Sequence, residues 1–524
     1  MLRTLFLTIV VLYILWIFVV PIWHFPDEQA HFGQVAYLTE EYKNSNKIEK
    51  YDLTYEIYMS EVFLGTVRDN SGNNKFTFHP KYKIPYSDNF EGLFEASIAA
   101  IVKSPNRGEL VIKESSQYPP LYYIPATLVY KLFYNSDLFV RVYAVRFWSL
   151  ALFALNIYFV YLLAKLLFGK NILLRLILTT MVAFQPMMIF ANIGVNSDSL
   201  GNLFFTIFLF LSIKLIINGC SLNNLVLIFI LTCLSIYTKP QFIIIIPLLS
   251  INLLFVALRD FKSKNSKFKL IFSSIILTLI ILFLLYFAKI GPATIIFRFF
   301  QRLNIISLFK FTWEYSLSHT YSEVLPWYWG IYDWLGVTYP RLIHRLINWT
   351  ILLSIIGLVK YIFLVVRNKK LKSRNVQAGV FLVFISAVYF IAICFYDWLS
   401  WYTQGYQLGV QGRYFFPVIS VHMLLILIGW RELFPDIKGI REKGIKILGI
   451  MMIALNFYAL YTVAKTYYNL WPVEVFIKQV SQYKPWFVKG WGFIFVSAFF
   501  LSSLIVFLIE YIKYSHDKKK SNHQ

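Results

Sequence analysis

Residues 4–32 read TLFLTIVVLYILWIFVVPIWHFPDEQAHF. The first two thirds form an apolar run long enough to cross a bilayer core, which takes about 20 residues in a helix. Arg3 precedes the run and no small-residue cleavage site follows it, so we expect an uncleaved anchor. Asp27, Glu28 and His31 come directly after it. The sequence therefore predicts a membrane helix that ends beside two acids and a histidine.

The composition extends this interpretation to the whole chain. Of 524 residues, 58% are hydrophobic, 19% are aromatic and 15% are charged, against roughly 25% charged in a soluble domain. A water-soluble enzyme is excluded. We expect an all-α integral membrane protein, with 1–524 forming one membrane domain of about twelve spans. The expected spans are 4–24, 142–167, 172–191, 198–217, 222–238, 241–258, 270–290, 343–366, 376–396, 414–432, 446–466 and 491–512.

The distribution of basic residues predicts the orientation of these spans. The formal net charge is +23, from 50 Lys and Arg against 27 Asp and Glu. It is scattered over alternate short loops, as the positive-inside rule requires of cytoplasmic loops, and is not gathered into a stripe that would bind nucleic acid. Both termini are predicted to be cytoplasmic. The basic groups include Lys165, Lys170, Arg175, Arg259, Lys262, Arg367, Lys369, Arg431, Lys438 and the tail 513–524.

On this map, large loops lie on the outer face. The first, 25–141, is polar enough to fold, and its apolar stretch Leu121–Phe133 is too short to span, so we expect an interfacial helix there. The second, 291–342, is rich in Trp and Tyr, which suit the headgroup interface for the most part and also suit stacking on sugars. A third, 397–413, is short.

Several kinds of site are not indicated by the sequence. Cys220, Cys233 and Cys394 lie far apart, so neither a disulfide framework nor a thiolate metal site is expected. No phosphate-binding G-x-x-x-x-G-K-[ST] or dinucleotide G-x-G-x-x-G sequence occurs. An ATP-driven pump is therefore disfavoured, and no cofactor is predicted.

The acids after the first span admit two interpretations. Pro26 can start a helix on which Asp27 and His31 stand one turn apart and face one substrate. Alternatively, Asp27 and Glu28 are first-turn acids favoured by the helix dipole. His24, His31 and Asp27 also suit a metal, but Asp and His four residues apart are too common to diagnose one, and a divalent metal is not favoured.

Other polar turns share the predicted outer face. An acid together with Lys239 and Arg413 would be able to activate a hydroxyl and hold a phosphate. The alternatives are that Lys239 snorkels to the interface and that Arg413 pairs with an acid such as Asp397. The turns are Tyr118-Pro-Pro-Leu-Tyr-Tyr123, Asn196-Ser-Asp198, Thr238-Lys239-Pro240 and Gln411-Gly-Arg413-Tyr-Phe-Phe-Pro417.

Taken in order, these strings resemble a bacterial multi-spanning membrane-protein family of the GT-C glycosyltransferase superfamily. The family pattern is P-P-D-E-x-x-H-F, P-P-L-x-Y, a polar Asn/Asp turn, T-K-P and Q-G-R-Y-x-x-P. The chain has F-P-D-E-Q-A-H-F, Y-P-P-L-Y-Y, N-S-D-S, T-K-P-Q and Q-G-R-Y-F-F-P between residues 25 and 417. Phe25 replaces the first proline, and no motif follows about residue 420. Trp329-Gly330 and Trp334-Leu335-Gly336 also resemble the family, without an assigned role.

The resemblance implies an inverting transfer of a sugar from a polyprenyl-phosphate donor, outside the cytoplasmic membrane, to an envelope glycan acceptor. It makes Asp27 the catalytic candidate, with Glu28 and His31 in support. Lys239 and Arg413 are expected at the donor phosphate, and Asp198, Tyr118 and Gln411 are further candidates. The expected partners are the lipid-linked sugar, membrane lipid and the acceptor.

Other classes of protein remain open from the sequence. A transporter or flippase of lipid-linked saccharides would place ionisable groups near the bilayer midplane, whereas here they cluster at one side. A polysaccharide polymerase or ligase would share the aromatic outer loops. The sugar, the acceptor and the oligomeric state are not determined by the sequence.

Overall fold

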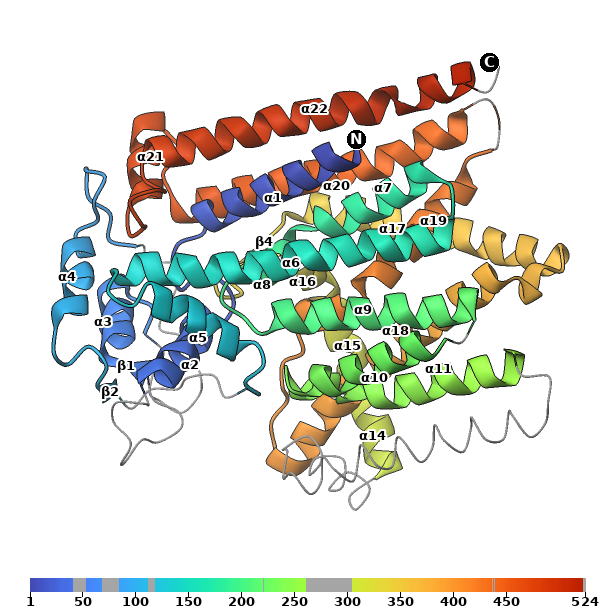
Figure 1. Ribbon diagram of the computed structural model, residues 1–524, viewed down its shortest axis with the longest axis horizontal. Coiled ribbons are helices and arrows are strands. Elements are labelled where there is room, and N and C mark those ends of the chain that lie inside the picture. Colours follow the sequence, from blue (N-terminus) through green and yellow to red (C-terminus); the bar gives the residue numbers. More distant parts are fainter. Residues whose placement is uncertain are drawn as a thin grey trace.

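The computed structural model describes residues 1–40, 53–67, 84–111, 118–219, 221–260, 304–435, 437 and 439–521. Long helices lie side by side, with their axes roughly aligned across Figure 1. Among the described residues, eight helices are long and apolar enough to cross a membrane. They are α1 (Leu2–Val19), α6 (Leu138–Phe168), α9 (Asp198–Asn218), α17 (Arg341–Arg367), α18 (Arg374–Gln404), η7 with α19 (Gly412–Val418 and Ile419–Leu433), α20 (Ile440–Tyr467) and α22 (Trp491–Ser521).

A ninth crossing is broken. Helices α7 (Ile172–Ala183) and α8 (Pro186–Asn192) are bent by 58° where one straight span, 172–191, was expected. Pro186 cannot donate a backbone hydrogen bond and disfavours helical backbone at the residue before it. Gln185 occupies that position with extended backbone and caps α8 through its side chain. The helix therefore restarts in a new direction.

Two further expected spans are helices shorter than a full crossing. They are α10 (Leu222–Ile236) and α11 (Ile245–Asp260), the latter preceded by the 3-10 turn η3 (Pro240–Ile244). The expected span 270–290 lies outside the described residues. The other expected ranges each overlap one of the helices above. The first ends early, at Val19, because Val20 is extended before Pro21.

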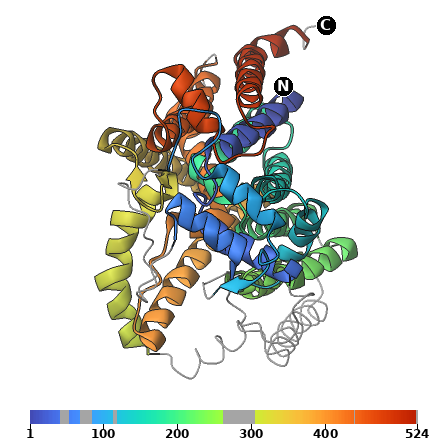
Figure 2. The same cartoon turned by 90° about the vertical axis from the view of Figure 1, so that its left-hand side faces the viewer.

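The segment expected as the first outer loop folds into a small layer at one end of the bundle, and this layer faces the viewer in Figure 2. Leu53 of β1 pairs antiparallel with Val111 of β2. The expected non-spanning helix near 121–133 is α5, which has ten residues. The elements are α2 (Glu28–Glu40), β1 (Leu53–Thr54), α3 (Tyr55–Leu64), α4 (Glu95–Ala100), η2 (Ile101–Lys103), β2 (Leu110–Val111) and α5 (Tyr123–Leu132).

The aromatic segment expected as an outer loop is mostly helical. From Ile305 to Trp329 the helix is continuous apart from changes of winding, and a hairpin follows it. Two turns in this helix are π-helical, a feature that recurs at functional sites. The elements are α14 (Ile305–Phe311), η4 (Thr312–Ser316), α15 (Leu317–His319), η5 (Thr320–Val324), α16 (Leu325–Trp329), β3 (Ile331–Tyr332) and β4 (Val337–Thr338). The remaining short helices are η6 (Lys370–Lys372) and α21 (Val473–Ser481).

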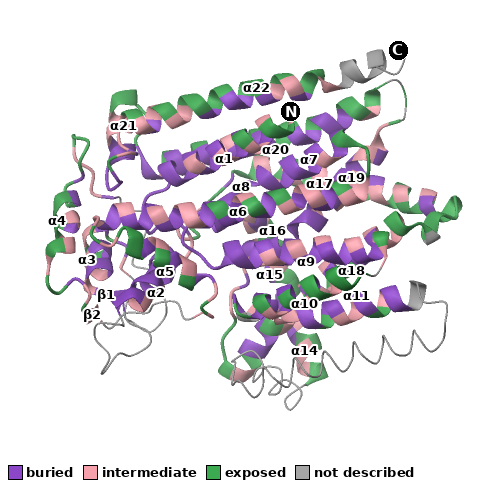
Figure 3. Cartoon of the chain, viewed as in Figure 1, coloured by how far each residue is buried: buried purple, intermediate pink, exposed green. Residues whose placement is uncertain are grey.

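Burial separates the central helices from those at the periphery (Figure 3). In the most apolar 18-residue stretch of α9, 72% of the residues are buried. The corresponding share is 17% in α17 and 28% in α22. Apolar side chains on the outer helices therefore face lipid. Helix α17 crosses α19 closely at Gly357 and Gly429, where a Cβ on either glycine would meet backbone oxygen at 1.9 Å.

The two termini lie on the same side of the bundle. The amino group of Met1 is 2.5 Å from a carboxylate oxygen of Glu510, on the last helix. Helices α1 and α22 run side by side in Figure 1.

Candidate functional site

An ion pair joins two segments 386 residues apart in the sequence. Arg413 Nη2 donates to Asp27 Oδ2 over 2.7 Å. Asp27 occupies the turn before α2 with φ 55°, in the left-handed region that non-glycine residues rarely adopt. Its side chain is 33% exposed, against 7% for Arg413. The carboxylate is therefore reachable from outside while its partner is held within the protein.

The neighbouring acid, Glu28, has a buried partner of its own. Its side chain and that of Arg146 on α6 are both fully buried, with Nη2–Oε2 and Nε–Oε1 distances of 2.6 and 2.8 Å. Glu28 also accepts from the backbone of Trp23 and Val195, at 3.0 and 3.2 Å. Arg146 donates in turn to carbonyls that follow α1, including that of Pro21. The pair ties the end of α1 to α2 and α6, and so it fixes the turn that carries Asp27.

A second ion pair lies beside the first. Lys239 Nζ is 2.5 Å from Asp198 Oδ1, where Asp198 begins α9 and Lys239 precedes Pro240. Burial by itself would lower the pKa of Lys239, but the Asp198 carboxylate raises it above its usual value. The ammonium therefore stays charged. Asn196 Nδ2 donates to the carbonyl of Pro26 over 3.3 Å and so connects this turn to the one bearing Asp27.

His31 lies between the two ion pairs. Its ring stacks on Tyr118 with centroids 5.4 Å apart, and its Nδ1 is 2.6 Å from the hydroxyl of Tyr123. Burial lowers its pKa to about 3, and the charges of Asp27, Lys239, Asp198 and Arg413 also act on it. The imidazole is therefore neutral at physiological pH. Lys239 Nζ lies 5.1 Å from the centre of the Tyr118 ring, which completes the cluster.

Arg413 retains hydrogen-bonding capacity. It is 8% exposed and uses Nη2 for Asp27, while its Nε and Nη1 are buried without a hydrogen-bond partner among the residues that the structure describes. Buried donors are nearly always satisfied in native proteins. The N–H groups of these two nitrogens therefore point to a ligand or to water.

Asp27 and Arg413 open onto a recess of about 80 Å³. Its lining includes His24, Pro26 and Asp27 from the turn before α2, and Ile331, Tyr332, Trp334 and Leu335 from the hairpin. Gln411 and Arg413, with Met187 and Phe190, complete the lining. The recess combines a carboxylate, a guanidinium, an amide and an indole.

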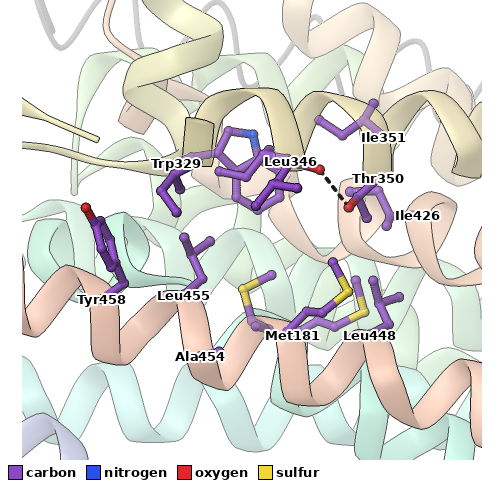
Figure 4. A pocket seen from close by; sticks show the side chains of 14 residues that line it. Met181, Trp329, Leu346, Thr350, Ile351, Ile426, Leu448, Ala454, Leu455 and Tyr458 are labelled. Carbon is purple, nitrogen blue, oxygen red and sulfur yellow. Dashed lines mark hydrogen bonds between the residues drawn. The ribbon is translucent and has the colours of Figure 1, made fainter. Parts of the chain in front are cut away.

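Two larger cavities lie against α17 and are apolar. The first holds about 350 Å³ and is lined by Met181, Trp329, Leu346, Met451 and Tyr458 among others (Figure 4). The second holds about 330 Å³ and shares Trp329, Ile351 and Ile426 with the first. Leu346 and Met451 are exposed on the surface. The first cavity therefore reaches the lipid-facing side of the protein.

The sequence-derived residues can now be placed. Asp27, His31, Tyr118, Asp198, Lys239, Gln411 and Arg413 come together at one end of the helices, and Glu28 lies buried behind Asp27. Arg413 pairs with Asp27 and not with Asp397, which instead accepts from the backbone N–H of Leu408 over 2.7 Å.

Sequence reasoning missed Arg146 and the turn at Asp333. Arg146 had a usable signal, since an arginine inside an apolar span demands a partner. For Asp333 the sequence held no such signal beyond the neighbouring Trp334-Leu335-Gly336 pattern, which had no assigned role.

The described residues contain no group of three or more His, Cys, Asp or Glu side chains placed to hold a metal ion. His24 and His31 have different surroundings. His24 Nδ1 lies 3.9 Å from Asp333 Oδ1 and its ring packs on Tyr467, whereas His31 contacts Tyr118 and Tyr123. A shared metal centre with Asp27 is therefore not preformed in the described part of the chain.

The fold and the site define a multi-pass helical membrane protein with paired charges gathered at one end of its helices. The chain belongs to the family described as predicted membrane protein (DUF2142), whose model matches residues 10–421. That range contains all five motifs of the first subsection. No curated protein matches the chain.

Among the solved structures that resemble the chain are archaeal oligosaccharyltransferases. One is the oligosaccharyltransferase AglB from Archaeoglobus fulgidus in complex with an inhibitory peptide and a dolichol-phosphate, at 14% identity and a TM-score of 0.40, covering 75% of this chain and 53% of that one. Another is the Archaeoglobus fulgidus oligosaccharyltransferase tethered with an acceptor peptide, at 15% identity and a TM-score of 0.35, covering 87% and 55%. The chain thus spans about half the length of these proteins.

Proposed function

We propose that this protein is an inverting glycosyltransferase that moves a sugar from a polyprenyl-phosphate donor to an envelope glycan acceptor on the outer face of the cytoplasmic membrane. The observation that carries the proposal is the buried Arg413, whose Nε and Nη1 lack partners among the described residues while Nη2 holds the partly exposed Asp27. A guanidinium with two nitrogens that still have N–H groups to donate suits a phosphate. A carboxylate beside it suits a base.

Asp27 is assigned the role of general base. Of the four paired charges it has the most exposed side chain, at 33% against 10% or less for the other three. It accepts the proton of the acceptor hydroxyl as that oxygen bonds to the anomeric carbon. The bond from that carbon to the phosphate oxygen breaks, and the polyprenyl phosphate departs with the electron pair.

The departing phosphate is assigned to the two cations. Arg413 offers its free N–H groups, and Lys239 adds a second positive charge nearby. Fixed cations in a site poor in water stabilise charge that develops in the transition state. A lipid monophosphate leaving group carries less charge than a nucleotide diphosphate, so the proposal requires no divalent metal and no other cofactor.

The remaining candidates are assigned positions around these groups. Glu28 fixes the turn of Asp27 through Arg146, and Asp198 and Tyr118 orient Lys239. His31 contributes a neutral ring between the two ion pairs. Gln411 lines the recess. Among these, only groups that touch the substrate would be catalytic, and the others position them.

The apolar cavities beside α17 supply a place for the lipid chain. Exposed Leu346 and Met451 give the first cavity access to the membrane. A prenyl chain that enters from lipid loses no hydrogen bonds there, because the lining is almost entirely apolar. The donor phosphate would then reach Arg413 from the membrane side.

The test uses the full chain in lipid nanodiscs. Binding of undecaprenyl phosphate is compared with that of undecaprenol, which lacks the phosphate. We expect the wild type to prefer the phosphate, and Arg413→Lys to lose that preference because a point charge does not replace a forked contact. With undecaprenyl phosphate bearing one radiolabelled sugar, Asp27→Asn should reduce transfer by about 10²–10⁴-fold with normal membrane insertion.

Different results would reject these assignments. Equal binding of undecaprenol and undecaprenyl phosphate to the wild type would show that Arg413 does not bind the donor phosphate. Full transfer by Asp27→Asn would show that Asp27 is not the general base. Movement of the labelled lipid across the bilayer without transfer would instead identify a flippase.

A further inference from the structure

The turn at Asp333, Trp334 and Leu335 has an unusual backbone. These three consecutive residues have φ of 52°, 52° and 69°. Non-glycine residues rarely adopt this region, and bulky residues such as Trp and Leu are genuine outliers there. Strained backbone of this kind persists only when its surroundings enforce it, and it is concentrated at functional sites.

The surroundings of this turn do enforce it. Gly336 N donates to Asp333 O over 2.9 Å, and β3 and β4 close the hairpin on either side. The hydroxyls of Tyr332 and Tyr339 lie 2.9 Å apart, and Thr338 Oγ1 donates to Gly330 O over 2.8 Å. The Tyr332 ring also packs edge-on against Phe190, with centroids 5.0 Å apart.

The turn and Asp27 belong to the lining of the same recess. Trp334 and Leu335 line it, as do Pro26 and Asp27. Asp27 itself has φ 55°, so two of the lining segments carry strained backbone. Leu335 is 44% exposed, so the lining of the recess extends to the protein surface.

The chemistry of the lining selects among ligands. An aromatic face is electronegative and attracts the weakly positive C–H groups on one face of a sugar ring. Carboxylate, amide and guanidinium groups bind the hydroxyls around the rim of such a ring. A lipid chain has no hydroxyls to bind these polar groups, and the apolar cavities beside α17 suit it better.

The size of the recess limits the ligand further. At about 80 Å³ it is smaller than the roughly 300–1,000 Å³ of sites that enclose a drug-sized molecule. It can therefore accept one side of a single ring, with the rest of the ligand outside its mouth. An oligosaccharide would not fit within it.

We propose that the turn Asp333–Leu335 is a recognition element for a single sugar ring, with Trp334 packed against the C–H face of the ring and Gln411 hydrogen-bonded to its hydroxyls. This inference rests on the proposed glycosyl transfer and adds the residues that recognise one ring of the sugar. Asp333 is a positioning residue in it. Its carboxyl lies below the turn at His24 and does not line the recess.

The test measures sugar binding separately from transfer. The full chain in lipid nanodiscs is titrated with methyl α- and β-glycosides of glucose, galactose, mannose and N-acetylglucosamine, followed by saturation-transfer NMR. At least one glycoside should bind to the wild type. Trp334→Ala should weaken it by about tenfold, and Trp334→Phe, which keeps an aromatic face, by less than about threefold.

Trp313→Ala is the matched control, because Trp313 is 69% exposed and does not line the recess. It should bind the same glycoside as the wild type does. Unchanged binding by Trp334→Ala, an equal loss in Trp313→Ala, or no glycoside bound by the wild type would each overturn the inference.

A pair of variants separates this inference from the proposed function. If Asp27→Asn abolishes transfer while Trp334→Ala binds sugar normally, the transferase proposal stands and the recognition element is rejected. If Trp334→Ala loses sugar binding while Asp27→Asn transfers normally, the sugar site stands and the catalytic assignment is rejected.

Discussion

At the scale of single residues, the site is organised by buried charges that each have a designated partner. Glu28 and Arg146 satisfy one another beneath the surface, and this leaves the adjacent Asp27 to face outward. Removing one partner of a buried pair costs more than the pair contributes, because the other charge is left uncompensated. The two consecutive acids therefore have different tasks, although their positions in the sequence look equivalent.

The buried carboxyl of Asp333 should make the free energy of unfolding depend on pH. Burial raises the pKa of its carboxyl from 3.8 to about 7. Between about pH 4 and pH 7 the folded protein keeps a proton that the unfolded chain has released, so the free energy of unfolding falls as the pH rises through this window. Asp333→Asn cannot ionise. Its free energy of unfolding should match that of the wild type at pH 4 and exceed it at pH 8, by up to about 4 kcal/mol.

Thermal unfolding in one detergent at both pH values measures this effect. The exposed Asp88, replaced by Asn, is the control for the same substitution at the protein surface. If Asp333→Asn shows the same difference from the wild type at pH 4 and pH 8, the carboxyl is not held in its protonated form.

At the scale of helices, glycines decide how closely two elements approach. Helices α17 and α19 meet at Gly357 and Gly429, and a Cβ on Gly429 would lie 1.9 Å from the carbonyl oxygen of Ser354. Small residues permit such contacts between membrane helices, where there is little hydrophobic force to draw helices together. Both helices also line the apolar cavities. Their separation therefore controls the space proposed for the lipid chain.

Gly429→Ala should push these helices apart and destabilise the protein by about 1–3 kcal/mol, because the new methyl group meets backbone that cannot move aside. Gly379→Ala on α18 is the control, since no atom lies within 4 Å of its Cβ position. Alanine there should be neutral or stabilising, as it favours helix more than glycine does. The measurement is the unfolding temperature in one detergent, and equal losses in both variants would contradict the close contact.

At the scale of the whole molecule, the small layer formed by α2 to α5 and the paired charges occupy one end of the bundle, and the two termini lie toward the other (Figure 1). Basic loops such as that at Lys170 predict which end faces the cytoplasm. The proposed transfer requires the end with Asp27 to face outward, where the lipid-linked donor and the envelope acceptor meet.

Cysteine labelling in intact cells tests this orientation. In a background without Cys220, Cys233 and Cys394, a cysteine at the exposed position Asn89 should react with a membrane-impermeant maleimide. One at the exposed Lys170 should react only after permeabilisation. The reverse pattern would place the site in the cytoplasm and rule out an outer-face reaction.

The sequence by itself determined that this is a helical membrane protein and where most of its helices lie, because hydropathy and basic loops are local properties of the chain. It also indicated which turns carry Asp27, Asp198, Lys239 and Arg413. Only the tertiary structure decided that Arg413 pairs with Asp27, that Glu28 is buried on Arg146, and that Trp334 and Leu335 line the recess beside Asp27. Such pairings depend on packing between segments far apart in the chain, and no local pattern records which distant side chain will compensate a buried charge.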